Sequence, residues 1–335
     1  MRCCVFGIGQ PKPKPYSNAK EGNYGMKLLS VIVPCHNEAP VLPIFFEEMK
    51  QVEQELLELA FEYVFVDDGS TDDTLNLLKE YASADESVRY ISFSRNFGKE
   101  AAMLAGLEHA AGDYVTIMDA DLQDPPSLLP KMYHMLLDEG LDCVATKRTD
   151  RKGEPKIRSF FADLFYKIYN HFSDVHIING ARDFRLMTRE MVQNIVTLKE
   201  KNRFSKGLFA WVGFQTKTIA YENVERAAGT TKWSFGKLFF YSLEGLLSFS
   251  TAPLTFISLL GFGSCVLSFV LIVDFVLQKL LRKIEVTGYA AMICIILFLG
   301  GIQLLSIGVL GQYLARIFTE TKGRPSYIIK EESKR

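Results

Sequence analysis

Two long stretches without a charged residue constrain this chain more than any other feature of its sequence. Residues 251–273 and residues 286–315 contain no Asp, Glu, Lys or Arg. A helix needs roughly 20 consecutive apolar residues to cross a bilayer, and each stretch is long enough to do so. The sequence therefore excludes a purely soluble protein. Because only two such stretches exist, it also excludes a many-pass transporter.

The remaining charge is balanced, which limits the kinds of partner that the chain can bind. The 335 residues include 38 Lys and Arg and 39 Asp and Glu, for a formal net charge of −1. Without a long basic stripe to neutralise phosphates, we expect no nucleic-acid partner. The six cysteines form no C-x-x-C pair, so we also expect no disulfide and no zinc site. Residues 1–25 lack the apolar core of a signal peptide, and we predict that they form a disordered extension.

From residue 28 onward, short β-branched runs alternate with longer amphipathic segments. This alternation is typical of parallel strands joined by crossover helices. We predict strands at 29–33, 63–66, 89–93, 114–118 and 142–145, and helices near 39–58, 72–84, 98–111 and 126–139. Ligands of open parallel sheets bind beyond the carboxyl ends of the strands. We therefore expect the polar clusters that follow these strands to lie in one crevice.

The second half of the chain contains the predicted membrane anchor. An α/β body at 26–233 would be followed by an interfacial amphipathic helix at 234–250. A first span at 251–278, a short outer loop at 279–286 and a second span at 287–315 would come next, followed by a cytoplasmic tail at 316–335. A helix buried against the body is the alternative for the amphipathic segment. Lys and Arg residues on the body side outnumber those of the loop, so we expect both termini on the cytoplasmic side of the membrane. Glycines of the second span offer a surface for close helix contacts, either with a second copy of the chain or within the hairpin.

The most informative polar cluster is Asp-Ala-Asp-Leu-Gln-Asp-Pro-Pro at residues 119–126. Asp119 and Asp121 follow a predicted strand and lie one residue apart, so their carboxylates can turn toward the same crevice. Such hard oxygen ligands suit Mg²⁺ or Mn²⁺, and a metal there would offset the charge of a diphosphate leaving group. An ordinary acidic turn is the alternative.

Two further clusters follow predicted strands. Asp67 and Asp68 precede Gly69, and their carboxylates could accept hydrogen bonds from a base or a ribose while the glycine permits a tight turn. The alternative is a helix start with acidic first-turn residues. Arg95 and Lys99 lie at a loop-to-helix junction that suits an anionic phosphate, although each could also be a surface charge.

Together these strand ends, with Ser-Val-Ile-Val-Pro-Cys-His-Asn-Glu at 30–38, resemble the N-terminal half of glycosyltransferase family 2. Downstream, Asp-Phe-Arg-Leu-Met at 183–187, Arg-Ala-Ala-Gly-Thr-Thr-Lys-Trp at 226–233 and Tyr-Leu-Ala-Arg at 313–316 resemble its polyprenyl-phosphate branch. The resemblance covers about residues 28–328. It implies the GT-A fold, an α/β domain with a Rossmann-like, mostly parallel sheet, followed by the interfacial helix and two transmembrane helices.

The resemblance also implies an activity. One sugar would pass, with inversion, from a nucleotide-diphosphate sugar to the phosphate of a polyprenol such as undecaprenol, at the cytoplasmic membrane face. A UDP-hexose, UDP-glucose for example, is the favoured donor. The same resemblance implies three sets of site residues. The donor would be bound by Pro34, Asn37, Glu38, Asp67, Asp68, Arg95, Asn96, Lys99 and Asp119. The metal would be held by Asp119, Asp121 and Gln123, and the catalytic residues that contact the reacting groups would be Asp183, Arg226 and Lys232.

Several alternatives stay open at this stage. A phosphate monoester already carries about −1.5 to −2 charge at neutral pH, so Asp183 would either orient the acceptor or help the metal instead of removing a proton. A processive polysaccharide synthase of the same family would usually have a Q-x-x-R-W motif and more membrane helices, which this sequence lacks. A non-catalytic nucleotide-sugar sensor is disfavoured because the candidate catalytic and metal-binding residues are all present.

Overall fold

The computed structural model describes residues 26–148, 167, 169–170, 175, 177–178, 180–222, 250–282 and 288–333. Three predictions fall outside the described residues: the extension at 1–25, nearly all of the interfacial helix at 234–250, and the site residues Arg226 and Lys232.

An eight-stranded sheet forms the centre of the described body, in the order β7-β5-β6-β4-β1-β2-β3-β8. The strands are β1 Lys27–Cys35, β2 Leu59–Asp67, β3 Val88–Phe93, β4 Tyr114–Ile117, β5 Cys143–Arg148, β6 Ala181–Thr188, β7 Thr216–Tyr221 and β8 Ile329–Glu332. Strands β1 to β4 run parallel, whereas β6 is antiparallel to both β4 and β5, and β8 is antiparallel to β3. The prediction of an α/β domain is confirmed, but the sheet is mixed because of β6 and β8, which the sequence patterns did not predict.

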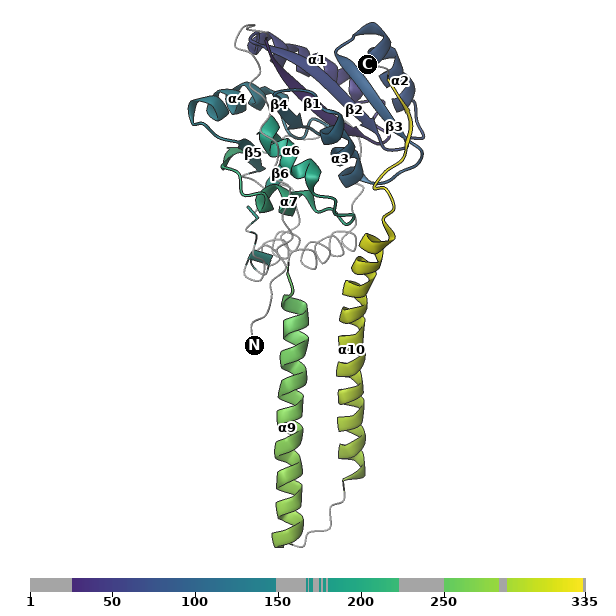
Figure 1. The fold of residues 1–335 in the computed structure, drawn as a ribbon, viewed down its shortest axis with the longest axis vertical. Helices are drawn as coiled ribbons and strands as arrows, with labels where there is room; N and C mark the ends of the chain where they lie inside the picture. Colours follow the sequence, from purple (N-terminus) through teal and green to yellow (C-terminus); the bar gives the residue numbers. More distant parts are fainter. Residues whose placement is uncertain are drawn as a thin grey trace, which may run out of the picture.

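Helices cover both faces of the sheet (Figure 1). They are α1 Leu42–Glu55, α2 Thr74–Ala84, α3 Lys99–His109, a short 3₁₀ helix at Pro126–Leu128, α4 Leu129–Asp138, α6 Arg189–Thr197 and α7 Ser205–Trp211. Alternate residues of a strand point to opposite faces. Val31 and Val33 accordingly pack in the core under α1 and α4, whereas Ile32 packs in the core under α3 and α6.

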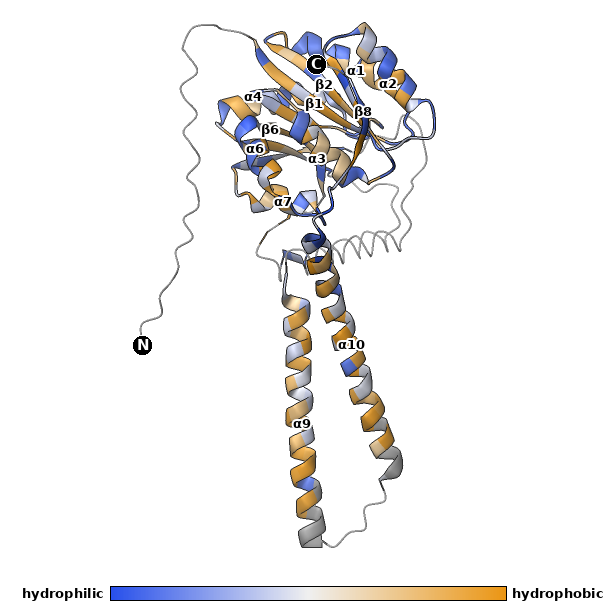
Figure 2. Cartoon of the chain, turned by 45° about the vertical axis from the view of Figure 1, so that its right-hand side comes forward, coloured by the Kyte–Doolittle hydropathy of each residue, from blue (hydrophilic) through white to orange (hydrophobic). Residues whose placement is uncertain are grey.

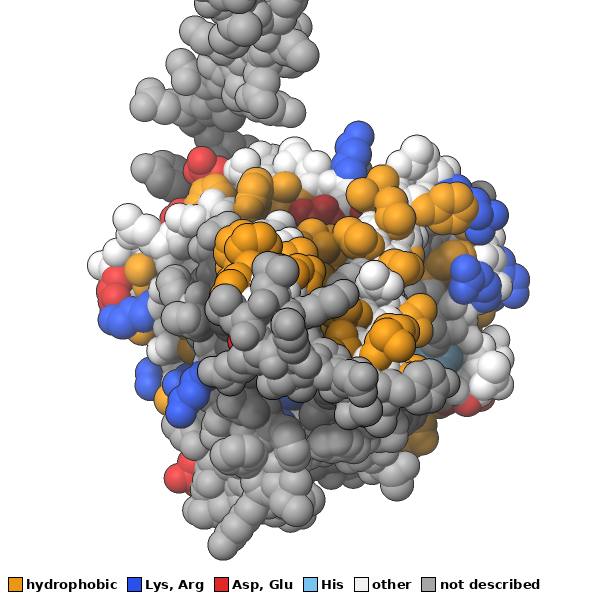
Figure 3. All heavy atoms as spheres, turned by 90° about the horizontal axis from the view of Figure 1, so that it is seen from below, with side chains coloured by type: hydrophobic (Ala, Val, Ile, Leu, Met, Phe, Trp, Pro, Cys, Tyr) orange, Lys and Arg blue, Asp and Glu red, His pale blue; other side chains and the backbone are white. Residues whose placement is uncertain are grey.

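Two long helices extend away from the body (Figure 1), and hydrophobic residues run along both of them (Figure 2). They are α9 Ala252–Arg282 and α10 Tyr289–Lys322. The segments Ala252–Asp274 and Ile295–Lys322 are long and apolar enough to cross a membrane. Seen from this end of the molecule, hydrophobic side chains gather in the middle of the face, with Lys and Arg at its rim (Figure 3). Helix α10 continues to Lys322, beyond the predicted end of the second span at residue 315.

After α10 the chain returns to the body and adds β8 to the free edge of β3. Gly323 ends the helix in a left-handed conformation with φ +63°, which glycine adopts without steric cost. The Tyr327 ring then stacks on Phe93 with 4.9 Å between ring centroids. Lys79 of α2 pairs with Glu331 at 2.8 Å. The predicted cytoplasmic tail therefore contains an edge strand of the eight-stranded sheet.

Candidate functional site

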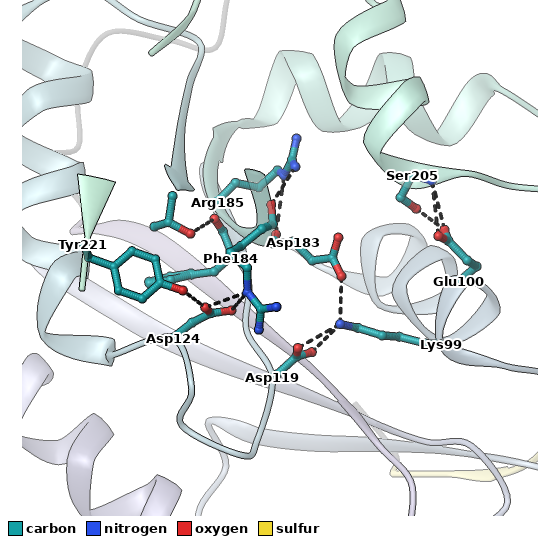
Figure 4. A network of polar contacts seen from close by, with 11 residues as sticks. Lys99, Glu100, Asp119, Asp124, Asp183, Phe184, Arg185, Ser205 and Tyr221 are labelled. Atoms are coloured by element: carbon teal, nitrogen blue, oxygen red, sulfur yellow. Dashed lines mark hydrogen bonds and ion pairs between the residues drawn. The ribbon is translucent and has the colours of Figure 1, made fainter. Parts of the chain in front are cut away.

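Lys99, the first residue of α3, lies at the centre of the candidate site (Figure 4). Its ammonium is 2.6 Å from Asp119 Oδ1 and 2.8 Å from Asp183 Oδ2. Asp119 follows the carboxyl end of β4, and Asp183 belongs to β6, which pairs with β4 in the register Ile117 with Arg185. The sheet and α3 thus bring together three predicted site residues that are far apart in the sequence.

The charges of this cluster stabilise one another. Burial alone would lower the pKa of Lys99, but Asp119 and Asp183 raise it well above its ordinary value. Burial alone would likewise raise the pKa of Asp183, yet Lys99 and then Lys206 hold it far below its ordinary value. Near neutral pH the lysine is therefore protonated and Asp183 is ionised. A carboxylate with so low a pKa is a poor proton acceptor.

Asp68 holds the loop that carries Lys99. Its two carboxylate oxygens accept hydrogen bonds from the backbone N–H of Phe97 at 2.6 Å and of Gly98 at 2.9 Å. The side chain is buried, and burial raises its pKa. The neighbouring Gly69 has φ +64°, and its backbone lies so close to Arg95 that a Cβ would be 2.5 Å from the Arg95 carbonyl carbon. The turn after β2 therefore fixes the loop between β3 and α3.

The other residues predicted to bind the nucleotide mostly form a second, adjoining network. Asp67 is buried and accepts hydrogen bonds from Ser92 Oγ at 2.8 Å and from the Ser70 N–H at 3.0 Å. Asn37 accepts from the Thr71 N–H at 2.8 Å, and the Glu38 N–H donates to a threonine hydroxyl of α2. These contacts join the loop after β1, which begins beside Pro34, to the loop after β2. Contact with a nucleotide stays a prediction for all of them.

Arg95 and Asn96 lie in the loop between β3 and α3, and both residues are exposed. The Arg95 guanidinium is 4.0 Å from the centroid of the Phe97 ring, and its Nη1 donates to the Asn96 carbonyl at 2.9 Å. The positive charge of Arg95 is therefore held at the surface, a few residues before Lys99 in the sequence. It lies beside the crevice rather than in the carboxylate cluster.

The predicted metal ligands lie in the loop that follows β4. Asp121 Oδ1 accepts the Gln123 backbone N–H at 3.2 Å, and Leu122 between them has φ +56°. Within the described ranges no group of three or more His, Cys, Asp or Glu side chains could hold a metal ion. Mg²⁺ is nevertheless often bound by only one or two carboxylates, with substrate phosphates and water completing the shell. The oxygen ligands of Asp119 and Asp121 fit such a site.

Four residues that the sequence patterns did not single out also belong to this region: Asp124, Arg182, Tyr221 and Arg148. Asp124, within the acidic motif, is 1% exposed and accepts hydrogen bonds from Arg182 Nε at 3.0 Å and from the Tyr221 hydroxyl. At the end of β5, Nε and Nη2 of Arg148 are buried and have no hydrogen-bond partner in the described part of the chain. Arg182 could have been found from the sequence because it directly precedes Asp183, whereas no sequence pattern pointed to Arg148.

Glu100 supports the cluster from α3. Its carboxylate accepts hydrogen bonds from the backbone N–H and the hydroxyl of Ser205, the first residue of α7. On α7, the Phe209 ring lies under the Arg185 guanidinium at 3.6 Å. Helix α7 is thereby held against β6 close to Asp183.

The fold and the site define an α/β enzyme with a cluster of charged side chains at the carboxyl ends of its parallel strands. Residues 30–196 match the family model described as Glycosyl transferase family 2. Together with relatives of high identity over nearly its whole length, this match shows that the chain belongs to glycosyltransferase family 2. The resemblance inferred from the motifs is confirmed at the level of the family.

The relatives match nearly the full chain. The bactoprenol glucosyl transferase of Shigella phage SfV is 42% identical over 307 residues, which are 92% of this chain and 99% of the relative. The prophage bactoprenol glucosyl transferase homolog of Escherichia coli K12 is 41% identical over 306 residues, covering 91% and 99%. Among solved structures, glucosyl-3-phosphoglycerate synthase from Mycobacterium tuberculosis, in complex with Mn²⁺, UDP-glucose and phosphoglyceric acid, aligns with a TM-score of 0.43. It is 21% identical and covers 66% of this chain and 79% of that one.

Proposed function

We propose that the protein is a membrane-anchored glycosyltransferase that moves one sugar from a UDP-hexose, UDP-glucose first among them, to the phosphate of a polyprenol. The observation that carries the proposal is the Lys99, Asp119 and Asp183 cluster at the carboxyl ends of the strands. Relatives named bactoprenol glucosyl transferases align with more than nine-tenths of the chain and support both the acceptor class and glucose as the sugar.

The two apolar helices support a membrane acceptor. A polyprenyl phosphate keeps its lipid tail in the bilayer and its phosphate at the surface, so the catalytic body must work at that surface. Helices α9 and α10 extend from the same side of the body (Figure 1), and as a hairpin they would keep the body and both termini on one side. We assign that side to the cytoplasm, because Lys and Arg residues are more numerous there than in the loop between the helices.

In the proposed reaction, a phosphate oxygen of the lipid attacks the anomeric carbon of the donor sugar. The new carbon–oxygen bond forms as the bond to the diphosphate breaks, the electron pair leaves with the UDP, and the configuration inverts. Two anions must approach each other, and nearby cations reduce their repulsion. Lys99 has this role within the described crevice, and we assign the same role to Arg148 and, by the family resemblance, to Arg226 and Lys232.

The low pKa of Asp183 argues against proton removal and is compatible with both of its open roles, orienting the acceptor and helping the metal. The acceptor oxygen is already deprotonated near neutral pH, so the reaction needs no strong base. We propose that Asp183 orients the acceptor and Lys99 rather than removing a proton. Asp119 and Asp121, with Gln123 beside them, would hold Mg²⁺ or Mn²⁺, which when bound offsets negative charge on the diphosphate.

The test is the reaction of the purified full-length protein, in detergent, with undecaprenyl phosphate, Mg²⁺ or Mn²⁺ and a panel of nucleotide sugars. We expect a lipid that carries a single sugar, with UDP-glucose the best donor. Products with several sugars would favour the processive synthase, and a bound but unconverted nucleotide sugar would favour the sensor. Either result would overturn the proposal.

The metal assignment has its own test. Asp121→Asn should abolish turnover, and it should also abolish the change in Mn²⁺ electron paramagnetic resonance signal that the wild type gives with UDP. The matched control is Asp138→Asn, an exposed residue at the end of α4. Unchanged turnover and Mn²⁺ binding in the Asp121 variant would show that the metal is held elsewhere.

A further inference from the structure

Arg182 of β6 presents a guanidinium of which the described residues contact only the Nε edge. Its Nε lies 3.0 Å and 3.3 Å from the two carboxylate oxygens of Asp124. Its two terminal nitrogens form no hydrogen bond with any residue that the structure describes. A structural Arg–carboxylate pair commonly uses two parallel N–H donors. In this arrangement the terminal nitrogens are left for another acceptor.

Asp124 is well placed to fix the direction of this side chain. It is almost fully buried and also accepts a hydrogen bond from the hydroxyl of Tyr221. A buried carboxylate with two donors holds both partners in place, because leaving its charge without a partner would be costly. Arg182 itself remains 26% exposed. Its guanidinium is therefore anchored on the protein side and accessible on the other.

The guanidinium is anchored to the acidic loop after β4, the loop that also contains Asp119 and Asp121. Burial lowers the pKa of Arg182, but the charges of Asp124 and then Asp119 raise it, so Arg182 is protonated beside these two carboxylates. Figure 4 shows Asp124 and Lys99 on opposite sides of Asp119. Lys99 and Arg182 thus supply positive charge from two sides of the carboxylate at the end of β4.

We propose that Arg182 is a phosphate-binding residue of this crevice and that Asp124 is the residue that positions it. The inference rests on the proposed function, which brings two phosphate groups here: the diphosphate of the donor and the monoester of the lipid. A guanidinium offers a planar pair of N–H donors that matches two phosphate oxygens, which an ammonium cannot do. The ligand is in either case a phosphoryl oxygen pair.

The experiment compares Arg182→Met and Arg182→Lys with the wild type. Calorimetry with UDP and Mg²⁺, without lipid, reports the donor side, and the KM values for UDP-glucose and undecaprenyl phosphate report both sides. Charge-assisted hydrogen bonds of this kind predict an affinity about 10- to 100-fold weaker in Arg182→Met. The lysine variant should recover only part of the loss because it lacks the planar fork. Weaker UDP binding identifies the donor, and a raised lipid KM alone identifies the acceptor.

Lys217→Met is the matched control, since it removes a cation whose exposed partner, Glu139, lies away from the crevice. Asp124→Asn tests the positioning role. It should raise the same dissociation constant or KM as Arg182→Met does, by a smaller factor. It remains informative if Arg182→Met fails to fold. UDP affinity and both KM values within about twofold of wild type in the folded Arg182 variants would overturn the inference. A wild type that forms no glycolipid would instead overturn the proposed function, while UDP binding would still decide the role of Arg182.

Discussion

Replacing Gly69 with alanine should disturb the loop that carries Lys99, and the structure allows the cost to be worked out. Gly69 has φ +64°, a left-handed conformation that costs a residue with a Cβ about 1–2 kcal/mol. Gly140, in the turn after α4, has φ +62°, but a Cβ added there would have no atom within 4 Å. Gly140→Ala is therefore a matched control that carries the same backbone strain without a steric contact.

At Gly69 the new Cβ would meet backbone rather than a side chain. It would lie 2.5 Å from the Arg95 carbonyl carbon, whereas ordinary contact begins at 3.4 Å, so the loop must shift by about 0.9 Å (3.4 − 2.5). Asp68 holds that loop through its bonds to the Phe97 and Gly98 N–H groups. Losing one such bond to a charged group costs about 1.5–3 kcal/mol. Added to the strain, the expected cost is about 2.5–5 kcal/mol for Gly69→Ala against about 1–2 kcal/mol for Gly140→Ala.

The assay pairs unfolding with kinetics. Thermal unfolding in the same detergent gives the difference in stability between the two variants, and the KM for UDP-glucose reports the position of Lys99. We expect Gly69→Ala to unfold at a clearly lower temperature than Gly140→Ala and, unlike it, to raise the KM. Equal unfolding temperatures and equal KM values for the two variants would refute the reasoning, because the contact with the Arg95 backbone would then impose no constraint.

Two further perturbations test contacts that stabilise the body. Glu62 is buried and accepts hydrogen bonds from Ser30 Oγ at 2.5 Å and Arg89 Nη1 at 2.8 Å. Burial raises the pKa of Glu62, but these two hydrogen bonds and one from a backbone N–H lower it overall. The stability that Glu62 contributes should therefore be fully present above the unfolded pKa of about 4.3 and be lost as pH falls through the folded value. Glu62→Gln should thus cost about 3 kcal/mol in urea unfolding at pH 7 and much less near pH 3; an equal cost at both pH values would contradict this. Tyr327→Ala, which removes the stack on Phe93, should raise the UDP-glucose KM more than Tyr327→Phe does, and identical kinetics for both variants would show that β8 does not support the loop.

The first half of the fold could be predicted because local pattern and tertiary structure agree there. The β-branched runs around Ile32 and Val64 are buried on both faces of the sheet, so they are apolar throughout. The loops after them are polar because they carry the site. Asp67, Asp68 and Asp119 could therefore be assigned to one crevice before any contact was known. The pattern could not show that the carboxylates of Asp67 and Asp68 already accept hydrogen bonds from other residues of the chain.

Strand β6 could not be recognised because its charges are compensated by distant residues. Arg182, Asp183 and Arg185 make the segment look like a polar loop, although Phe184 and Leu186, which alternate with Asp183 and Arg185, are fully buried. Arg185 is buried as well, because Phe209 of α7 lies against its guanidinium. Strand β6 also lies between β5 and β4 in the sheet, and its pairing with β4 skips β5 in the sequence. No local window of sequence contains these partners.

The C-terminal tail makes the same point and bears on how the anchor works. Ile329–Glu332 is short and rich in charge, yet it forms β8 because β3 would otherwise present an unpaired edge. The end of α10 is also fixed directly, since Glu320 accepts the Lys201 N–H at 2.7 Å. Under the proposed topology, α10 is thus joined to the body at two separate places, one of them next to the loop that carries Lys99. Two attachments restrict rotation of the body relative to α10 more than one flexible linker would, and under the proposed function they would keep the Lys99 cluster at the membrane surface, where a lipid phosphate is found.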